Sequence, residues 1–114
     1  MLEIMKQTNE FIKNHKKYLK KIERSIKVVL KDSQTYLFGS IIEGNLVAGS
    51  DIDILIIANV PKNHLTRAEL IATIEENVEL PISHPFEFHL ITQEELEIWI
   101  QIYKFKFEKI SKYI

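Results

Sequence analysis

The chain has 114 residues, 46% hydrophobic positions, a formal net charge of −1 and no cysteine. A single domain of this length can bury one hydrophobic core. The lack of cysteine excludes disulfide frameworks, thiolate metal sites and cysteine nucleophiles. No apolar run approaches the ~20 residues of a membrane-spanning helix, and residues 1–10 lack the uninterrupted apolar centre of a signal peptide. We therefore expect one cytoplasmic domain over residues 1–114 that makes no contact with a membrane.

The small net charge conceals a segregation of charge along the chain. Residues 1–35 contain nine Lys or Arg and four Asp or Glu, residues 36–100 contain two and eleven, and residues 101–114 contain four and one. Basic ends around an acidic middle are typical of a cation-binding centre flanked by surfaces for an anionic substrate. The same pattern arises when lysine-rich helix faces are only solvated, so the charges alone leave both interpretations open.

Residues 2–31 predict a long basic helix, because apolar side chains recur there every three to four positions and lysines fill much of the remaining surface. Residues 35–38 are predicted to form a strand. Residues 51–58 predict a second strand, so apolar that it should be central and covered on both faces. Thr66 and Glu69 have the spacing of a capping box, which predicts that the next helix begins there.

Residues 86–91 alternate between apolar and polar side chains and predict a third strand. Its two faces are expected to carry Phe86, Phe88 and Leu90 on one side and Glu87, His89 and Ile91 on the other. A second capping-box spacing, from Thr92 to Glu95, predicts a final helix over residues 93–112. The order α-β-β-α-β-α predicts an α/β (α+β) fold, in which helices cover a small mixed β-sheet.

Two aspartates stand at the beginning of the apolar second strand. Asp51 and Asp53 are two residues apart, so both carboxylates are expected on the same face of the strand. Like charges held close together in a partly dehydrated segment repel each other unless a cation or a shared proton compensates them. Oxygen ligands without cysteine favour Mg²⁺ or Mn²⁺ over zinc. The pair is therefore a candidate metal site.

A third carboxylate and a glycine-containing loop can complete this site. If the strand that carries Glu87 neighbours the strand of Asp51 and Asp53, three acids can bridge two cations about 3.5–4 Å apart. Gly39 and Ser40 directly follow the first strand. Glycine lets backbone N–H groups approach a polyphosphate, and the serine hydroxyl can donate to a phosphate oxygen.

Three more polar residues lie near these motifs in the sequence. Ser50 can donate to a phosphate in the same way or cap the following strand. His89 shares a predicted face with Glu87, where it is either a metal ligand or hydrogen-bond partner in the cleft, or a structural side chain. His84 precedes Pro85 and is restricted to an extended conformation, which favours a structural or exposed role.

The stretch from Gly39-Ser40 to Asp51-Ile52-Asp53 resembles the signature of the DNA polymerase β nucleotidyltransferase superfamily, in particular its small stand-alone members, the minimal nucleotidyltransferases. Residues 84–95 are similar to an archaeal branch of that group, and the resemblance covers residues 36–100. It implies a polymerase-β-like fold with its catalytic core in residues 35–91. The functional positions that carry over are Gly39 and Ser40 for the triphosphate, and Asp51, Asp53 and Glu87 as catalytic metal ligands.

The resemblance implies metal-dependent transfer of a nucleoside monophosphate, AMP from ATP, to an acceptor hydroxyl, with two Mg²⁺ or Mn²⁺ ions. Small members of the family commonly act as antitoxins beside a helical HEPN ribonuclease, in some cases by adding AMP to a tyrosine of the toxin. We expect the same role and a HEPN partner here. The basic first helix and the aromatic last helix are candidate surfaces for that partner or for a homodimer.

Two positions depart from the family pattern. The third acid of the family is usually aspartate where this chain has Glu87, and many minimal members have an arginine where this chain has Glu43. The alternative function is therefore a catalytically weak domain that neutralises a partner by contact. Direct RNA binding through the lysine faces is a third and less favoured function.

Overall fold

The computed structural model of the chain describes residues 15–44, 49–104 and 106–114. The elements in chain order are α2 (His15–Val29), β1 (Gln34–Phe38), α3 (Ser40–Glu43), β2 (Ile52–Ile57), α4 (His64–Val78), β3 (Phe86–Ile91), α5 (Gln93–Tyr103), β4 (Phe107–Lys109) and the 3₁₀ turn η1 (Ile110–Tyr113). The predicted basic helix is present from His15 to Val29, and its predicted part over residues 2–14 lies outside the described residues.

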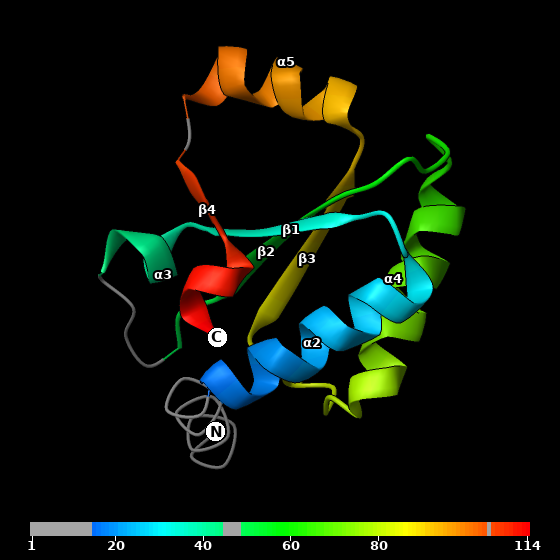
Figure 1. Cartoon of the computed structure of the whole chain (residues 1–114), viewed down its shortest axis with the longest axis vertical. Helices are drawn as coiled ribbons and strands as arrows, with labels where there is room; N and C mark the ends of the chain where they lie inside the picture. The colour runs from blue at the N-terminus through cyan, green and yellow to red at the C-terminus, as the bar shows by residue number, and fades with distance from the viewer. Residues whose placement is uncertain (1–14, 45–48, 105) are drawn as a thin grey trace.

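The strands form one mixed sheet in the order β3-β2-β1-β4 (Figure 1). β2 pairs with β3 in parallel, and β1 is antiparallel to both β2 and β4. The parallel pair is joined through α4, as a parallel connection requires a crossover. The prediction of a mixed α+β fold with β2 inside the sheet is confirmed.

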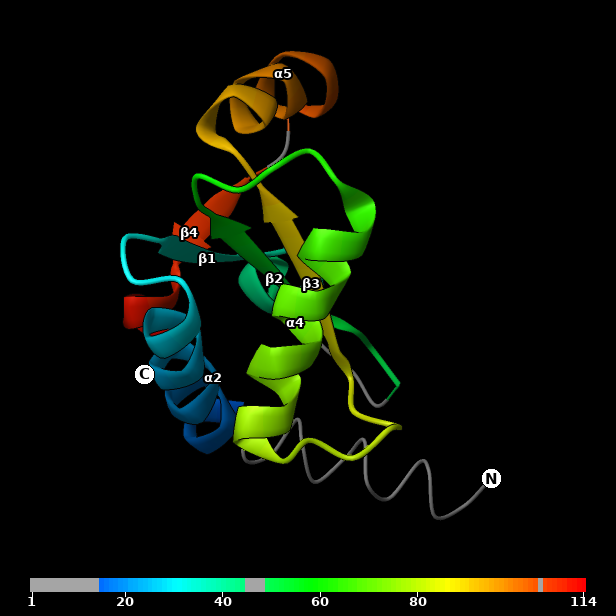
Figure 2. The ribbon, with the colours of Figure 1, turned by 90° about the vertical axis from the view of Figure 1, so that its right-hand side faces the viewer.

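Helices α2 and α4 lie together on one face of this sheet (Figures 1 and 2). The main core joins the two helices to that face, with Leu19, Ile22 and Ile26 from α2 and Ile52, Ile54 and Ile56 from β2 all fully buried. The opposite face carries a smaller apolar cluster of Leu55, Ile57, Ile91 and Leu96. Because successive side chains of a strand point to opposite faces, β2 is covered on both sides, as its composition predicts.

The start of α4 differs from the prediction. Asn63, not Thr66, is the N-cap, because its Oδ1 accepts hydrogen bonds from the backbone N–H groups of Leu65 (2.9 Å) and Thr66 (3.1 Å). The helix therefore begins at His64, and the predicted capping box of Thr66 is wrong. An Asn in extended conformation satisfies the free N–H groups of the first turn before Thr66 is reached.

The last predicted helix, residues 93–112, is also too long. The capping box of Thr92 and Glu95 is confirmed, but α5 ends at Tyr103, with Lys104 in the left-handed region at φ 46°. The chain then adds β4 to the edge of β1, so that Phe38 pairs with Phe107. The edge of β1 has backbone N–H and C=O groups that β4 satisfies with hydrogen bonds. If α5 continued, these groups would have no partner in the sheet. No helix in the described ranges is long and apolar enough to cross a membrane.

Candidate active site

The register of the parallel strands places the two central acids side by side. Asp53 of β2 pairs with Glu87 of β3, and Leu55 pairs with His89 two positions further on. Asp53, Glu87 and His89 are therefore on the sheet face opposite to α2 and α4, as the alternation along each strand requires. The expectation that the strand of Glu87 neighbours the strand of Asp53 is confirmed.

These three side chains approach one another closely enough to share an ion. His89 Nε2 lies 3.3 Å from Asp53 Oδ1 and 3.8 Å from Glu87 Oε1. One ligand atom from each residue lies within 4.8 Å of the other two. Asp53 and His89 are 21% and 25% exposed, whereas Glu87 is 54% exposed. Two carboxylates and one imidazole can hold a divalent cation, for which the imidazole nitrogen is the softer ligand.

Two aromatic rings pack near the imidazole of His89. The ring centroid of Phe38, at the end of β1, is 5.0 Å away, and that of Trp99, on α5, is 6.1 Å away. The ring is therefore confined between the sheet and α5. This packing presents Nε2 to Asp53, and the sequence alternation alone had already placed His89 on this face.

The glycine after β1 brings its backbone against the same carboxylate. Gly39 has φ 77° and ψ −150°, and a Cβ built on it would overlap with Asp53 Oδ2. Its carbonyl oxygen accepts hydrogen bonds from the N–H groups of Ile42 (3.1 Å) and Glu43 (3.2 Å) in α3. Only glycine adopts this conformation readily and leaves the space free. Because Gly39 has no side chain, the start of the loop can pack directly against the carboxylate of Asp53.

Residues 12–112 match the nucleotidyltransferase domain family. The chain belongs to this family, which is part of the polymerase β superfamily. A crystal structure from Sulfolobus solfataricus, provisionally described as that of a nucleotidyltransferase, has the same fold, with a TM-score of 0.54 and 16% sequence identity over 91% of this chain and 84% of that chain. Comparison with curated protein sequences found no match. The superfamily resemblance is confirmed, while its archaeal minimal-nucleotidyltransferase detail stays a prediction.

Not all the predicted site residues of this nucleotidyltransferase gather at one point. Asp51 is exposed, precedes β2, and does not belong to the cluster of Asp53, Glu87 and His89. Ser40 is the first residue of α3, directly after Gly39, and Ser50 is half-buried beside Asp51. Residues 45–48 of the loop lie outside the described residues. The roles of Asp51, Ser40 and Ser50 stay predictions.

A hydrogen-bond network that the sequence did not predict supports the start of β3. The backbone N–H of Phe86 donates to His84 Nδ1 (3.1 Å), so His84 is protonated on Nε2, which donates to Glu75 Oε2 of α4 (2.5 Å). The N–H of Ile52 donates to the carbonyl of Pro85 at 2.8 Å. This hydrogen bond connects Ile52, the residue before Asp53, with Pro85, two residues before Glu87. His84 has the structural role that its place before Pro85 favours.

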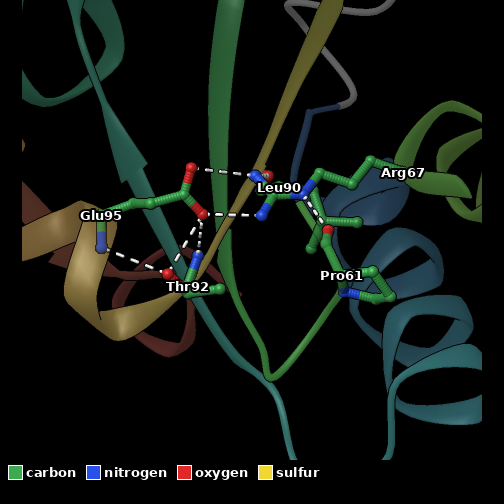
Figure 3. Close-up of polar contacts among 5 residues, drawn as sticks. All are labelled: Pro61, Arg67, Leu90, Thr92 and Glu95. Atoms are coloured by element: carbon green, nitrogen blue, oxygen red, sulfur yellow. Dashed lines mark hydrogen bonds and ion pairs between the residues drawn. The ribbon is translucent and has the colours of Figure 1, made fainter. Parts of the chain in front are cut away.

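Arg67 supports the opposite end of the same strand (Figure 3). Its guanidinium donates to both carboxylate oxygens of Glu95 (2.7 and 3.1 Å), and to the carbonyls of Leu90 (3.2 Å) and Pro61 (2.7 Å). The hydrogen bonds from Arg67 lower the pKa of Glu95 to about 2. The Glu95 carboxylate also accepts from Thr92 within the capping box. One cation thus joins α4, the end of β3 and the start of α5.

Proposed function

We propose that this protein transfers a nucleoside monophosphate, AMP from ATP, to an acceptor hydroxyl, with Mg²⁺ or Mn²⁺ held by Asp53, Glu87 and His89. The observation that carries the proposal is the in-register pairing of Asp53 and Glu87, with His89 Nε2 within 3.3 and 3.8 Å of their carboxylates. Family membership supports nucleotidyl transfer in general. Asp51 as a further ligand, and a second ion, belong to this proposal.

The bound cation would neutralise charge on the triphosphate and so stabilise the charge that develops during transfer. The chain's own contribution is to position the reactants. The backbone of Gly39 packs directly against the Asp53 carboxylate, which keeps the start of the loop beside the acids, and the Ser40 and Ser50 hydroxyls are proposed donors to the triphosphate. The triphosphate is thereby aligned with the acids.

The reaction itself needs one proton acceptor. The acceptor oxygen forms a bond to the α-phosphorus, the bond from that phosphorus to the pyrophosphate oxygen breaks, and pyrophosphate leaves. The hydroxyl proton passes to the carboxylate of Glu87, which at 54% exposure is the most accessible of the three ligands.

For the acceptor we propose a protein, specifically a HEPN ribonuclease that the domain neutralises as an antitoxin. The support is an exposed apolar surface on α5: Ile98 is 50%, Ile102 63% and Tyr103 69% exposed. The same helix carries Trp99, which contacts His89. A protein bound to α5 would therefore lie next to the proposed site, and we propose that one of its hydroxyls is the acceptor.

The second candidate is the binding module that acts without catalysis. It is favoured by the position of Asp51, which lies outside the cluster, and by the high exposure of Glu87. Both leave the site with fewer closely held carboxylates than the three that the motif predicts. The exposed face of α5 would serve contact equally well.

The experiment that tests the proposal is transfer of label from [α-³²P]ATP with Mn²⁺ or Mg²⁺ to a purified HEPN ribonuclease. We expect labelling by the parent, its loss in Asp53→Asn and Glu87→Gln, and its retention in the control Glu69→Gln, which replaces an exposed acid of α4. Inhibition of the ribonuclease is measured in parallel. Full inhibition by Asp53→Asn without any labelling would refute the enzymatic proposal and support the binding module.

A further inference from the structure

The outer side of α2 is an almost unbroken array of cations. Its members lie at three- and four-residue spacing, are all exposed, and make up what we call the basic face: Lys16, Lys17, Lys20, Lys21, Arg24 and Lys27. The inner side of the helix carries the buried residues Leu19, Ile22, Ser25 and Ile26. The basic face spans eleven residue steps, about 17 Å along the helix axis.

The basic face has little acidic compensation among the described residues. None of its six side chains forms an ion pair there; Lys27 donates instead to the carbonyl of Ser33, and Lys21 Nζ lies 6.0 Å from the ring centroid of Tyr18. The only acid of α2 is Glu23, which is partly buried, stands at helical spacing from Lys20 and Lys27, and lines a hollow with Lys20, Arg24 and Lys27. Like charges three and four residues apart repel each other along a helix. Six cations and the single acid Glu23 leave a net charge of +5 on the helix, which an anionic partner would neutralise.

We infer that the basic face binds a nucleic-acid duplex through its phosphate backbone. Lys and Arg that neutralise phosphates supply the sequence-independent part of such binding. A protein partner fits less well, since the centres of protein interfaces are poor in lysine, and the outer side of α2 offers Val28 as its exposed large apolar residue.

A membrane surface and a single strand fit the basic face less well than a duplex. An interfacial helix buries its apolar side in lipid, but Leu19, Ile22 and Ile26 are 0% exposed in the core of the domain. Single-strand sites use aromatic platforms for the bases. Tyr18 of α2 is half-buried and packs at 6.1 Å from Phe86. The side chains that remain available on the basic face are cations, and the phosphates of a duplex backbone are complementary to them.

The basic face is separate from the proposed nucleotide site. Helix α2 packs on the sheet face opposite to Asp53, Glu87 and His89, beside the C-terminal turn η1 (Figure 1). Five of the cations and Ile114 line a shallow hollow of about 490 Å³ at that position. Duplex binding therefore does not depend on nucleotidyl transfer, and the two can be tested independently.

The test is fluorescence anisotropy of the full chain with a labelled 20-base-pair duplex, as DNA and as RNA of the same sequence, over a series of NaCl concentrations. We expect binding to both duplexes, with log K falling linearly against log [NaCl] by about 0.9 for each phosphate neutralised. The variant Lys20→Gln/Arg24→Gln should weaken binding at least tenfold at low salt and reduce the slope by about 2. The control Lys62→Gln/Lys104→Gln removes two exposed cations elsewhere and should leave both unchanged.

Several results would overturn the inference: no binding at low salt, equal loss in both double variants, tighter binding to the matching single strand, or a preference for phosphatidylserine vesicles over the duplex. Circular dichroism checks that Lys20→Gln/Arg24→Gln is folded, which its exposed positions lead us to expect. Asp53→Asn should bind the duplex as the parent does. Loss of binding in Asp53→Asn would place the nucleic acid at the nucleotide site, which refutes a separate surface and leaves the proposed function standing.

Discussion

The backbone of Gly39 lies against the carboxylate of Asp53. A Cβ on Gly39 would overlap with Asp53 Oδ2, and φ of 77° with ψ of −150° is a conformation that L-residues rarely adopt. Position 39 is therefore constrained twice, by backbone conformation and by space. Gly44 differs in this respect, because it has φ of 78° but nothing within 4 Å of its would-be Cβ. Substitutions at both glycines introduce conformational strain, but only a substitution at Gly39 also causes steric overlap with Asp53. Comparing the two positions therefore distinguishes these effects.

We predict that Gly39→Ala abolishes Mn²⁺ binding, whereas Gly44→Ala leaves it within twofold of the parent. Both variants should lose stability through backbone strain, about 1–2 kcal/mol for Gly44→Ala in its left-handed conformation and more for Gly39→Ala. Isothermal titration with Mn²⁺ and urea unfolding measure the two effects. Equal Mn²⁺ affinities in the two variants would show that the approach of Gly39 to Asp53 does not matter for the ion.

The second prediction concerns the pH dependence of stability at Arg67 and Glu95. The pKa of Glu95 falls from 4.5 to about 2 on folding, so this carboxylate stabilises the fold above pH 4.5, and the contribution is lost as the pH falls from 4.5 towards 2. Glu95→Gln can still cap α5 but loses the ion pair. It should be less stable by at most about 3 kcal/mol at pH 7, with the difference shrinking below pH 4.5.

Urea unfolding at pH 7, 4 and 3 checks this prediction, with Glu97→Gln as the matched control. Glu97 is an exposed acid of the same helix and has no ion pair among the described residues. Its variant should follow the parent at every pH. A difference between the parent and Glu95→Gln that stays constant from pH 7 to 3 would contradict the role of the ionised carboxylate.

The third prediction separates the two aspartates of the motif. Asp53 belongs to the three-residue cluster, whereas Asp51 is exposed and precedes β2. Without nucleotide, Asp53→Asn should therefore weaken Mn²⁺ binding more than tenfold, and Asp51→Asn by less than threefold, because loss of a metal ligand has the larger effect. Titration of each variant with Mn²⁺ decides this. Equal losses would show that Asp51 is a full ligand, as the family resemblance implies.

The periodic parts of the fold could be predicted from the sequence, and the parts that depend on distant partners could not. The alternation in residues 86–91 placed Glu87 and His89 on one face, because strand geometry is local. By contrast, β4 forms only because the edge of β1 is free to pair with it. Phe107 and Ile110 fit a helical spacing equally well, so no local signal distinguishes the two outcomes.

The same limit applies to the site. Its acids were predictable because Asp53 and Glu87 interrupt apolar strands, where charged side chains are rare unless a partner compensates them. The contact of Glu75 with His84 was not predictable, since it joins α4 to a loop through side chains nine residues apart. The position of Asp51 depends on where β2 begins, and strand ends are set by pairing with the neighbouring strands.

The fourth prediction assigns His84 a positioning role for Glu87. Its ring accepts from the Phe86 N–H and donates to Glu75, while the Pro85 carbonyl holds Ile52. His84→Phe keeps the ring volume but leaves the Phe86 N–H and the Glu75 carboxylate without this partner, so we expect a loss of about 1–3 kcal/mol and a weaker affinity for Mn²⁺. His84→Asn retains an acceptor for Phe86 and should recover part of the Mn²⁺ affinity. The exposed His64, replaced by Phe, should change neither quantity. If His84→Phe lowers stability but binds Mn²⁺ as the parent does, the network supports the fold and has no part in positioning the acids.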